Sequence, residues 1–394
     1  MNSSSKTGNA AGNRKILICL NAAWNLVNFR AGLIRSLIAN GYEVVAVAPS
    51  DEYAPRLEKL GCRYVPLPMD SKGTHPGRDM QLLWRFLRLL RRERPDVFLG
   101  YTVKPNIYGS LAAHALGIPV VNNIAGLGTA FMKDGWLTRL VRLLYRLAFA
   151  RSRRVFFQND DDQQAFVEAG LVRCGQADRL PGSGIDLQGF SQVPNPSREG
   201  RKFRFLLVAR MLWDKGVGEY VEAARLVRRK FPNVEFYLLG FLDVQNPAAI
   251  SREQMDAWVA ERAVYYLGAT DDVRPHIAAA DCIVLPSYYR EGVPRTLLEA
   301  AAIGRPIITT NAVGCREVVE DGVNGFLCRP RDDADLAEKL ERMITLSPEA
   351  RAKMGRSGRE KMEREFDERI VIDRYLAIIE EILGGSQNAH LNKN

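Results

Sequence analysis

The chain has 394 residues, of which 46% are hydrophobic and 26% charged, a composition typical of globular proteins and a length sufficient for two α/β domains. Residues 1–190 hold 25 Lys and Arg against 15 Asp and Glu, a net charge of +10, whereas residues 191–394 hold 30 against 31, a net charge of −1. This composition excludes a largely disordered or fibrous protein, and the basic first half indicates an anionic partner, either nucleic acid or lipid headgroups.

The first half alternates short apolar runs with helix-length amphipathic stretches. Candidate strands lie at Lys15–Leu20, Glu43–Ala48, Arg63–Leu67, Asp96–Gly100, Ile118–Ile124 and Arg153–Gln158. Continuous apolar runs predict strands buried on both faces, and their alternation with helices predicts a parallel, doubly wound sheet. No G-x-G-x-x-G follows the first run, and its loop at Asn21–Asn25 holds no glycine, which argues against a dinucleotide-dependent dehydrogenase.

Two predicted helices of the first half, Leu82–Arg94 and Trp136–Arg154, combine arginine with leucine and aromatic residues. In the second helix, leucines recur at three- and four-residue intervals with arginines between them, at Leu137, Leu140, Leu144 and Leu147. Such helices can lie in a headgroup layer, with leucines inserted and arginines on phosphates. A surface helix that buries its leucines in the domain has the same pattern. The charge excess favours contact with lipid.

Three aspartates, Asp160–Asp162, come between the last strand of this half and a predicted helix. Acidic residues at this place either bind a divalent metal ion or cap the helix, and we expect the cap. His75 and His114 are candidate bases by residue type, but His114 lies among Ala112, Ala113 and Leu116 and is expected to be structural. Because no cluster of Cys and His has metal-ligand spacing, neither a metal ion nor a cofactor is predicted.

A polar segment separates the two halves, at Ser191–Lys202 (SQVPNPSREGRK), and its composition predicts a linker. Candidate strands resume after it at Phe203–Ala209, Val234–Leu239, Val264–Leu267, Cys282–Pro286 and Pro306–Thr310. We therefore predict two domains, residues 1–190 and 203–366, with a ligand-binding cleft between the carboxyl ends of two sheets. Residues 367–394 are predicted to form a helix that returns to the first domain, followed by a flexible tail.

Candidate binding residues follow two strands of the second half. Arg210 and Lys215 come after Phe203–Val208, and two fixed cations at the end of a strand can neutralise the charge of a departing diphosphate. A solvated basic loop is the alternative for this pair taken alone. Glu291 and Gly292 come after Cys282–Pro286, on a loop.

A helix is predicted to begin near Pro294, because proline suits a first helical position. The free amides of Arg295 and Thr296, with the positive end of the helix dipole behind them, then form a phosphate site. Glu299 can accept two ribose hydroxyls and Glu291 can bond a sugar ring. On spacing alone, both carboxylates are explained equally well as residues favoured by the helix dipole.

Together these residues resemble the signature of retaining glycosyltransferase family 4, because Arg210 and Lys215 match R-x4-K-G, and Glu291 and Glu299 match E-x7-E. The resemblance covers almost the whole chain and implies the GT-B fold, with two Rossmann-like domains. It implies that Arg210 and Lys215 hold the diphosphate of a nucleotide sugar. It also implies that Glu299 holds the ribose and that Glu291 contacts the donor sugar.

Further segments are similar to one branch, bacterial enzymes that transfer N-acetylgalactosamine or a related N-acetylated sugar onto an undecaprenyl-diphosphate-linked saccharide. These segments are Asn28–Arg30, Lys104–Ala113, Gly126–Gly128, Gly182–Asp186 and Ala209–Val217. By this resemblance Lys104, Asn106, Gly126 and Gly128 lie on the acceptor side of the cleft. Val103 departs from the pattern, since a member of the branch has His there.

The resemblance implies a retaining transferase that moves a sugar, of the N-acetylated hexosamine class, from a UDP-sugar to a polyprenyl-diphosphate-linked saccharide in bacterial surface polysaccharide or glycan biosynthesis. Neither a metal ion nor nucleic acid is needed. Six scattered cysteines, no signal peptide and no apolar run of about 20 residues predict a cytoplasmic protein. The basic first half and the lipid-linked acceptor that the resemblance implies predict a peripheral location on the inner membrane face. Two alternatives stay open. They are a nucleotide-sugar epimerase of GT-B shape, which needs no acceptor, and a non-catalytic nucleic-acid-binding protein.

Overall fold

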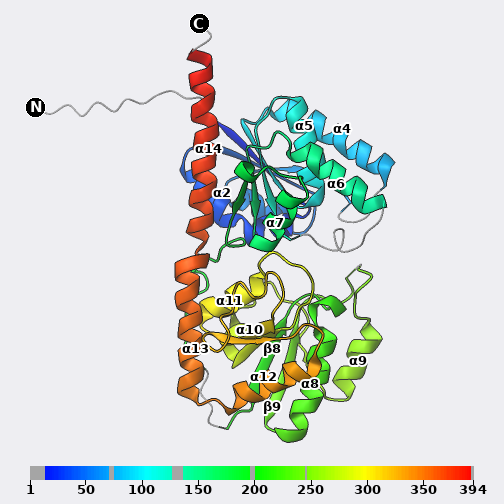
Figure 1. The fold of residues 1–394 in the computed structure, drawn as a ribbon, viewed down its shortest axis with the longest axis vertical. Coiled ribbons are helices and arrows are strands. Elements are labelled where there is room, and N and C mark those ends of the chain that lie inside the picture. The colour runs from blue at the N-terminus through cyan, green and yellow to red at the C-terminus, as the bar shows by residue number, and fades with distance from the viewer. Residues whose placement is uncertain (1–13, 71–74, 127–135, 196–199, 245, 392–394) are drawn as a thin grey trace, which may run out of the picture.

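The computed structural model describes residues 14–70, 75–126, 136–195, 200–244 and 246–391. Within them, two parallel sheets form the centres of two domains that lie one above the other in Figure 1. Each sheet is flanked by helices, so that apolar strand residues are buried on both faces. The predicted fold class is therefore confirmed.

The first sheet has seven parallel strands in the order β3-β2-β1-β4-β5-β6-β7. Leu17 at its centre lies opposite Val45 on one side and Phe98 on the other. The strands are β1 (Lys15–Cys19), β2 (Glu43–Ala48), β3 (Arg63–Pro66), β4 (Val97–Tyr101), β5 (Val120–Ile124), β6 (Arg154–Phe157) and β7 (Ala177–Arg179). The helical segments are α1 (Ala23–Phe29), α2 (Ala31–Ala39), α3 (Ala54–Lys59), α4 (Pro76–Glu93), η1 (Pro105–Gly109), α5 (Ser110–Ala115), α6 (Trp136–Phe149), α7 (Asp160–Glu168) and η3 (Cys174–Gln176).

The second sheet has six parallel strands in the order β10-β9-β8-β11-β12-β13. They are β8 (Phe203–Val208), β9 (Val234–Leu239), β10 (Tyr265–Tyr266), β11 (Cys282–Leu285), β12 (Ile307–Thr310) and β13 (Gly325–Cys328). The helical segments are η4 (Trp213–Lys215), α8 (Val217–Lys230), α9 (Arg252–Ala260), α10 (Arg274–Ala279), α11 (Arg295–Ile303), α12 (Asp333–Thr345), α13 (Pro348–Lys361), η5 (Met362–Phe366) and α14 (Glu368–Leu391).

The sequence analysis missed two strands, β7 and β13, and each is the edge strand of its sheet. The three residues of β7, Ala177–Arg179, include two charged side chains and are not an apolar run. β13 has four residues and begins with a glycine. An edge strand needs only one neighbour and little apolar length, so such strands leave a weak signal in the sequence.

The C-terminal helices connect the two domains along one side, as Figure 1 shows. α13 packs against α11 of the second domain, and α14 packs against α2 of the first. Val371, Tyr375 and Ile379 of α14 are buried in a core cluster of the first domain. Where the chain crosses back, the Ile185 amide donates to the Phe366 carbonyl (2.8 Å) and thus joins the two crossing segments.

The strand orders place the candidate residues at the edge where the two domains meet. Connections leave in opposite directions from the neighbouring strands β8 and β11, and this is the point at which open α/β sheets bind ligands. The segments after these two strands hold Arg210, Lys215 and Glu291. Parallel neighbours end at the same edge, so the topology brings these segments together.

Candidate functional site

The segment after β8 lies against the end of β11. Gly216 has φ +76, and a Cβ there would lie 2.1 Å from the Pro286 carbonyl oxygen, so only glycine allows this approach. The Lys215 ammonium lies 2.5 Å from a carboxylate oxygen of Glu291, and both side chains are largely buried. Arg210, at the end of β8, is exposed. The structure thus brings Lys215 and Glu291 into direct contact, at the sheet edge where the strand order places both segments.

The Glu291 carboxylate is also held from its own loop. Its other oxygen accepts a hydrogen bond from the Ser287 hydroxyl (2.7 Å). The amides of Tyr288 and Tyr289 both donate to the Asp214 carbonyl oxygen (3.1 Å each), which fastens this loop to η4. Burial raises the pKa of the Asp214 carboxyl, and the nearby Lys215 ammonium offsets part of that rise. Cation and carboxylate therefore lie on two loops that are bonded together.

Helix α11 follows this loop, and it begins one residue later than predicted. Pro294 is the N-cap, with extended backbone (ψ 119), and Arg295 is the first helical residue. The first helical bond runs from the Leu297 amide to Pro294, so the amides of Arg295 and Thr296 stand ahead of it at the positive end of the helix. The Thr296 hydroxyl donates to the Val208 carbonyl (3.1 Å) and ties the helix start to the end of β8.

The two long side chains at the start of α11 form an ion pair. Arg295 donates to Glu299 one turn later (3.2 Å), and also to the Ser183 hydroxyl (3.1 Å) and the Gly184 carbonyl (2.6 Å). Glu299 is 12% exposed. Burial raises the pKa of its carboxyl, and Arg295 opposes that rise. The guanidinium of Arg295 is thus bonded to the segment that crosses between the domains, and its backbone amide remains for a ligand.

The predicted acceptor-side residues lie in different surroundings. Lys104 forms a largely buried ion pair with Asp79 of α4 (2.9 Å). Asn106 is buried, donates to the Asn123 carbonyl (2.9 Å) and accepts from Asn122 (2.9 Å). Both side chains are therefore bonded within the first domain, and their place in the cleft stays a prediction.

The structure places only one of the two predicted acceptor-side glycines, Gly126 and Gly128. Gly126 has φ +104, and a Cβ there would lie 2.6 Å from the Gly292 nitrogen, so the first domain touches the Glu291 loop at this point. This contact also places the predicted donor-site residue Gly292 at the domain boundary. Gly128 lies outside the described residues.

The three aspartates of α7 each pair with an arginine. Asp160 bonds Arg179 (3.2 Å), Asp161 bonds Arg316 (2.7 Å) and Asp162 bonds Arg290 (2.7 Å). The side chain of Asn159, directly before them, accepts from the Asp162 amide (2.8 Å) and caps the helix. Within the described ranges, no three Asp, Glu, His or Cys groups lie close enough together to hold a metal ion.

Two of these pairs cross between the domains, because Arg290 and Arg316 belong to the second. Another contact between the domains joins Asp271 to the Tyr53 hydroxyl (2.5 Å) and to Arg56 (2.6 Å). The hydrogen bond to Asp271, together with burial, raises the pKa of Tyr53 to about 12. The contacts between the domains were not found from the sequence. A helix cap was expected at the three aspartates, and the residue that caps is Asn159, directly before them.

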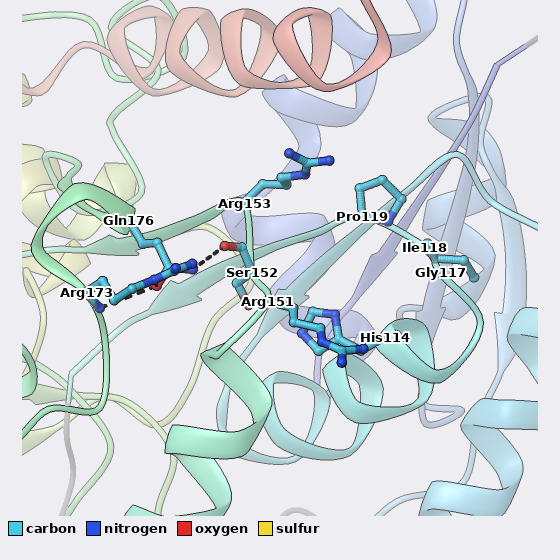
Figure 2. A pocket seen from close by; sticks show the side chains of 9 residues that line it. All are labelled: His114, Gly117, Ile118, Pro119, Arg151, Ser152, Arg153, Arg173 and Gln176. Atoms are coloured by element: carbon cyan, nitrogen blue, oxygen red, sulfur yellow. Dashed lines mark hydrogen bonds between the residues drawn. The ribbon is translucent and has the colours of Figure 1, made fainter. Parts of the chain in front are cut away.

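A basic hollow lies at the opposite edge of the first sheet, around the residues that precede β5 and β6 (Figure 2). Its lining includes Arg151, Arg153, Arg173 and His114. The guanidinium groups in Figure 2 point in different directions, and Arg173 is bonded to Gln176 (2.9 Å). His114 contacts the Ala148 carbonyl (2.8 Å), which gives it a structural role, and burial lowers its pKa. The basic side chains of this hollow therefore do not converge on a single point.

Comparison with known proteins matches both halves of the chain to glycosyltransferase families. The family described as "Glycosyl transferase 4-like domain" matches residues 28–181, and that described as "Glycosyl transferases group 1" matches residues 202–345. The chain is 27% identical over 377 residues to the N,N'-diacetylbacillosaminyl-diphospho-undecaprenol alpha-1,3-N-acetylgalactosaminyltransferase of Campylobacter jejuni, covering 92% of this chain and 97% of that protein.

A second relative is the UDP-Gal:alpha-D-GlcNAc-diphosphoundecaprenol alpha-1,3-galactosyltransferase of Escherichia coli, 26% identical over 68% of this chain and 70% of that protein. Among solved structures, Anabaena HepE in complex with UDP and glucose superposes with a TM-score of 0.73 at 21% identity, covering 93% of this chain and 98% of that one. WaaG, a glycosyltransferase involved in lipopolysaccharide biosynthesis, has a TM-score of 0.70 at 19% identity, with coverage of 94% and 100%. These structures establish the fold.

Proposed function

Because the chain is a glycosyltransferase of family 4 with the GT-B fold, we propose that it transfers an N-acetylated hexosamine from a UDP-sugar to a saccharide carried on polyprenyl diphosphate, with retention of anomeric configuration. The pathway class is bacterial surface polysaccharide or glycan biosynthesis. The observation that carries the proposal is the Lys215–Glu291 pair beside the N-terminus of α11. The substrates of the Campylobacter and Escherichia relatives, as their names state them, support the donor and acceptor classes.

In the proposed reaction, the bond between the anomeric carbon and the diphosphate oxygen breaks, and the acceptor hydroxyl forms the new bond on the same face. The hydroxyl proton passes to an oxygen of the departing diphosphate, so no protein nucleophile is needed. Arg210, Lys215 and the first amides of α11 stabilise the charge on that diphosphate. Glu299 accepts the ribose hydroxyls, and Glu291 accepts a hydroxyl of the donor sugar.

The proposal is tested by incubating the enzyme with UDP-N-acetylgalactosamine, UDP-N-acetylglucosamine and other UDP-sugars in EDTA, with and without a polyprenyl-diphosphate-linked saccharide. We expect one donor to be consumed only when acceptor is present, with an α-linked product. Conversion of the donor alone to its epimer would favour the epimerase alternative. Activity that is lost in EDTA and restored by Mn²⁺ or Mg²⁺ would contradict metal independence.

The proposal extends to a membrane surface that would present the acceptor. Helix α6 buries Val141, Tyr145 and Phe149 against the first domain. Leu144 of the predicted leucine stripe packs against the same core and is not exposed, which corrects the prediction at that position. Leu140, Leu143 and Leu147 are 39%, 52% and 53% exposed, which differs from the ordinary surface helix that buries its leucines. Leu143 was not part of the predicted leucine stripe, and the side chain of Leu137 is not among those that the structure describes.

Helix α4 presents further exposed apolar side chains on the same side of the domain. α4, α5 and α6 cover one face of the first sheet, away from α14, as Figure 1 shows. Met80 and Trp84 of α4 are 57% and 63% exposed. The leucines, Trp84 and the surrounding arginines form the pattern of a helix pair that lies in anionic headgroups. No helix in the described ranges has the length and apolar character needed to span a bilayer.

We expect the protein to bind anionic liposomes and to be released in part by salt, because each Lys or Arg near the surface contributes about 1 kcal/mol that salt screens. Replacing Leu143 and Leu147 with Glu should release it more completely than salt does, since inserted leucines add a salt-insensitive part. Cosedimentation measures both. The matched control replaces Val259 and Val323, exposed apolar residues of the second domain, with Glu. Equal release by both double variants would contradict this surface.

A further inference from the structure

The loop that carries Glu291 belongs to the second domain but is held by the first. Arg290 donates to Asp162 (2.7 Å), across 128 residues of sequence. The Asn159 amide group donates to the Glu291 carbonyl oxygen (3.3 Å), and the Val293 amide donates to the Gln158 side chain (3.0 Å). Three residues of this loop are therefore bonded to one short segment at the start of α7.

The first-domain side of this contact is buried and bonded. Asn159 and Asp162 have no exposed surface, and Gln158 is 6% exposed. Asn159 bonds both the Asp162 amide and its carboxylate (2.8 and 3.1 Å), so the donor and the acceptor that meet the loop are themselves held in place. Side chains whose own positions are locked in this way can hold a partner to a fraction of an ångström.

The fit on the loop side is as close. A Cβ on Gly292 would lie 2.1 Å from the Gln158 side-chain oxygen, and one on Gly126 would lie 2.6 Å from the Gly292 nitrogen. From the other side, a Cβ on Gly314 would lie 1.7 Å from the Gly292 carbonyl oxygen. The backbone at Gly292 is thus enclosed by both domains, and the neighbouring Glu291 cannot move unless these contacts change.

We propose that Asn159 and Asp162 of the first domain are positioning residues for Glu291, so that the acceptor-binding domain completes the geometry of the donor site. This inference rests on the proposed function, since it takes Glu291 as a donor-sugar contact. Glu291 faces Lys215 and Ser287 with its carboxylate. Its carbonyl oxygen and the neighbouring Arg290 are bonded to the first domain, and Gly292 lies in close contact with it. Separation of the domains would release that backbone.

A second ion pair at the same helix end serves as a control for the pair of Arg290 and Asp162. Arg316 donates to both oxygens of Asp161 (2.7 Å each), so this pair also crosses between the domains with the same chemistry. Both side chains are more than one-third exposed. The link from this pair to the Glu291 loop runs through the Asp161 backbone carbonyl, which accepts a long hydrogen bond from Arg290 (3.5 Å) and does not involve the Arg316 side chain. A variant at Arg316 therefore weakens the domain contact without touching the residues next to Glu291.

The test compares Asp162→Asn, Arg290→Gln, Arg316→Gln and Glu291→Gln in the full chain. Asp162→Asn and Arg290→Gln should each lower kcat by about 10- to 100-fold, as misplacement of a reacting group by about 1 Å does. Affinity for UDP, which lacks the sugar, should change less than about twofold, and Arg316→Gln should keep wild-type kcat. Combined with Glu291→Gln, the Asp162 substitution should cause no further loss, because both act through one carboxylate.

The outcomes separate this inference from the function on which it rests. If Glu291→Gln is impaired while folded Asp162→Asn and Arg290→Gln keep wild-type kcat, the positioning role is overturned and the proposed function stands. Losses that multiply in the double variant, or an Arg316→Gln loss as large as that of Asp162→Asn, also overturn it. Wild-type transfer by Glu291→Gln would overturn the proposed site itself. Arg290→Gln leaves α7 intact and serves if Asp162→Asn unfolds.

Discussion

Replacement of Lys215 with alanine should lower kcat for sugar transfer by about 100- to 1,000-fold, the loss seen when one preorganised charge-stabilising group is removed. Its ammonium lies on a short helical turn locked against β11 by Gly216, so it meets a departing diphosphate without reorganisation. Water cannot replace it well, because the side chain is only 12% exposed. Steady-state transfer assays of the purified variant measure the effect.

Two companion variants make the Lys215 result interpretable. The substitution leaves the Glu291 carboxylate without its cation, so thermal unfolding must show that the variant is folded. Lys230→Ala removes a lysine of the same domain that is 66% exposed and pairs with Glu341, and it should keep wild-type turnover. A folded Lys215→Ala enzyme with near-wild-type turnover would show that the diphosphate is held elsewhere.

Replacement of Glu299 with alanine or glutamine should weaken binding of the UDP-sugar by about 100-fold, and most turnover should be lost with it. Hydrogen bonds to a charged group contribute about 1.5–3 kcal/mol each, and the carboxylate is proposed to accept two from the ribose. Arg295 keeps its bonds to Ser183 and Gly184 after the change, so the helix start should stay in place. Calorimetric titration with UDP measures the loss.

A modified ligand identifies the contact behind the Glu299 effect. Wild-type enzyme should bind UDP much more tightly than the analogue that lacks both ribose hydroxyls, and Glu299→Gln should bind the two with similar affinity. This comparison isolates the bonds between Glu299 and the ribose from any general change in the site. Equal preference for UDP in both enzymes would place the ribose against another residue.

The sequence was most informative where local pattern and topology coincide. Apolar runs between helices predicted the parallel sheets, because a strand buried on both faces must be continuously apolar. Lys215 and Glu291 each follow such a strand, and neighbouring parallel strands end at one edge, so their meeting could be expected from the order of the elements. Pro294 was placed one position inside the helix, since the same residue type suits the N-cap and the first turn.

The acceptor side was less predictable, because its candidates came from resemblance alone. Lys104 and Asn106 stand in a segment that suggested the cleft, yet the structure bonds them to Asp79 and to the asparagines of β5. A polar residue after a strand can turn to the cleft or to its own domain. Only the positions of its partners, which are distant in sequence, determine the direction.

By itself the sequence determined the two doubly wound domains, the glycosyltransferase signature and the amphipathic character of α6, since all three depend on patterns that can be followed along the chain. Only the tertiary structure decided that Leu143 and Leu147 remain exposed, because a helical period does not say which face meets the domain. It also decided that Asp162 holds Arg290 beside Glu291. That contact joins two domains whose relative orientation no local pattern encodes, and it exists because both sheets present their carboxyl edges to each other.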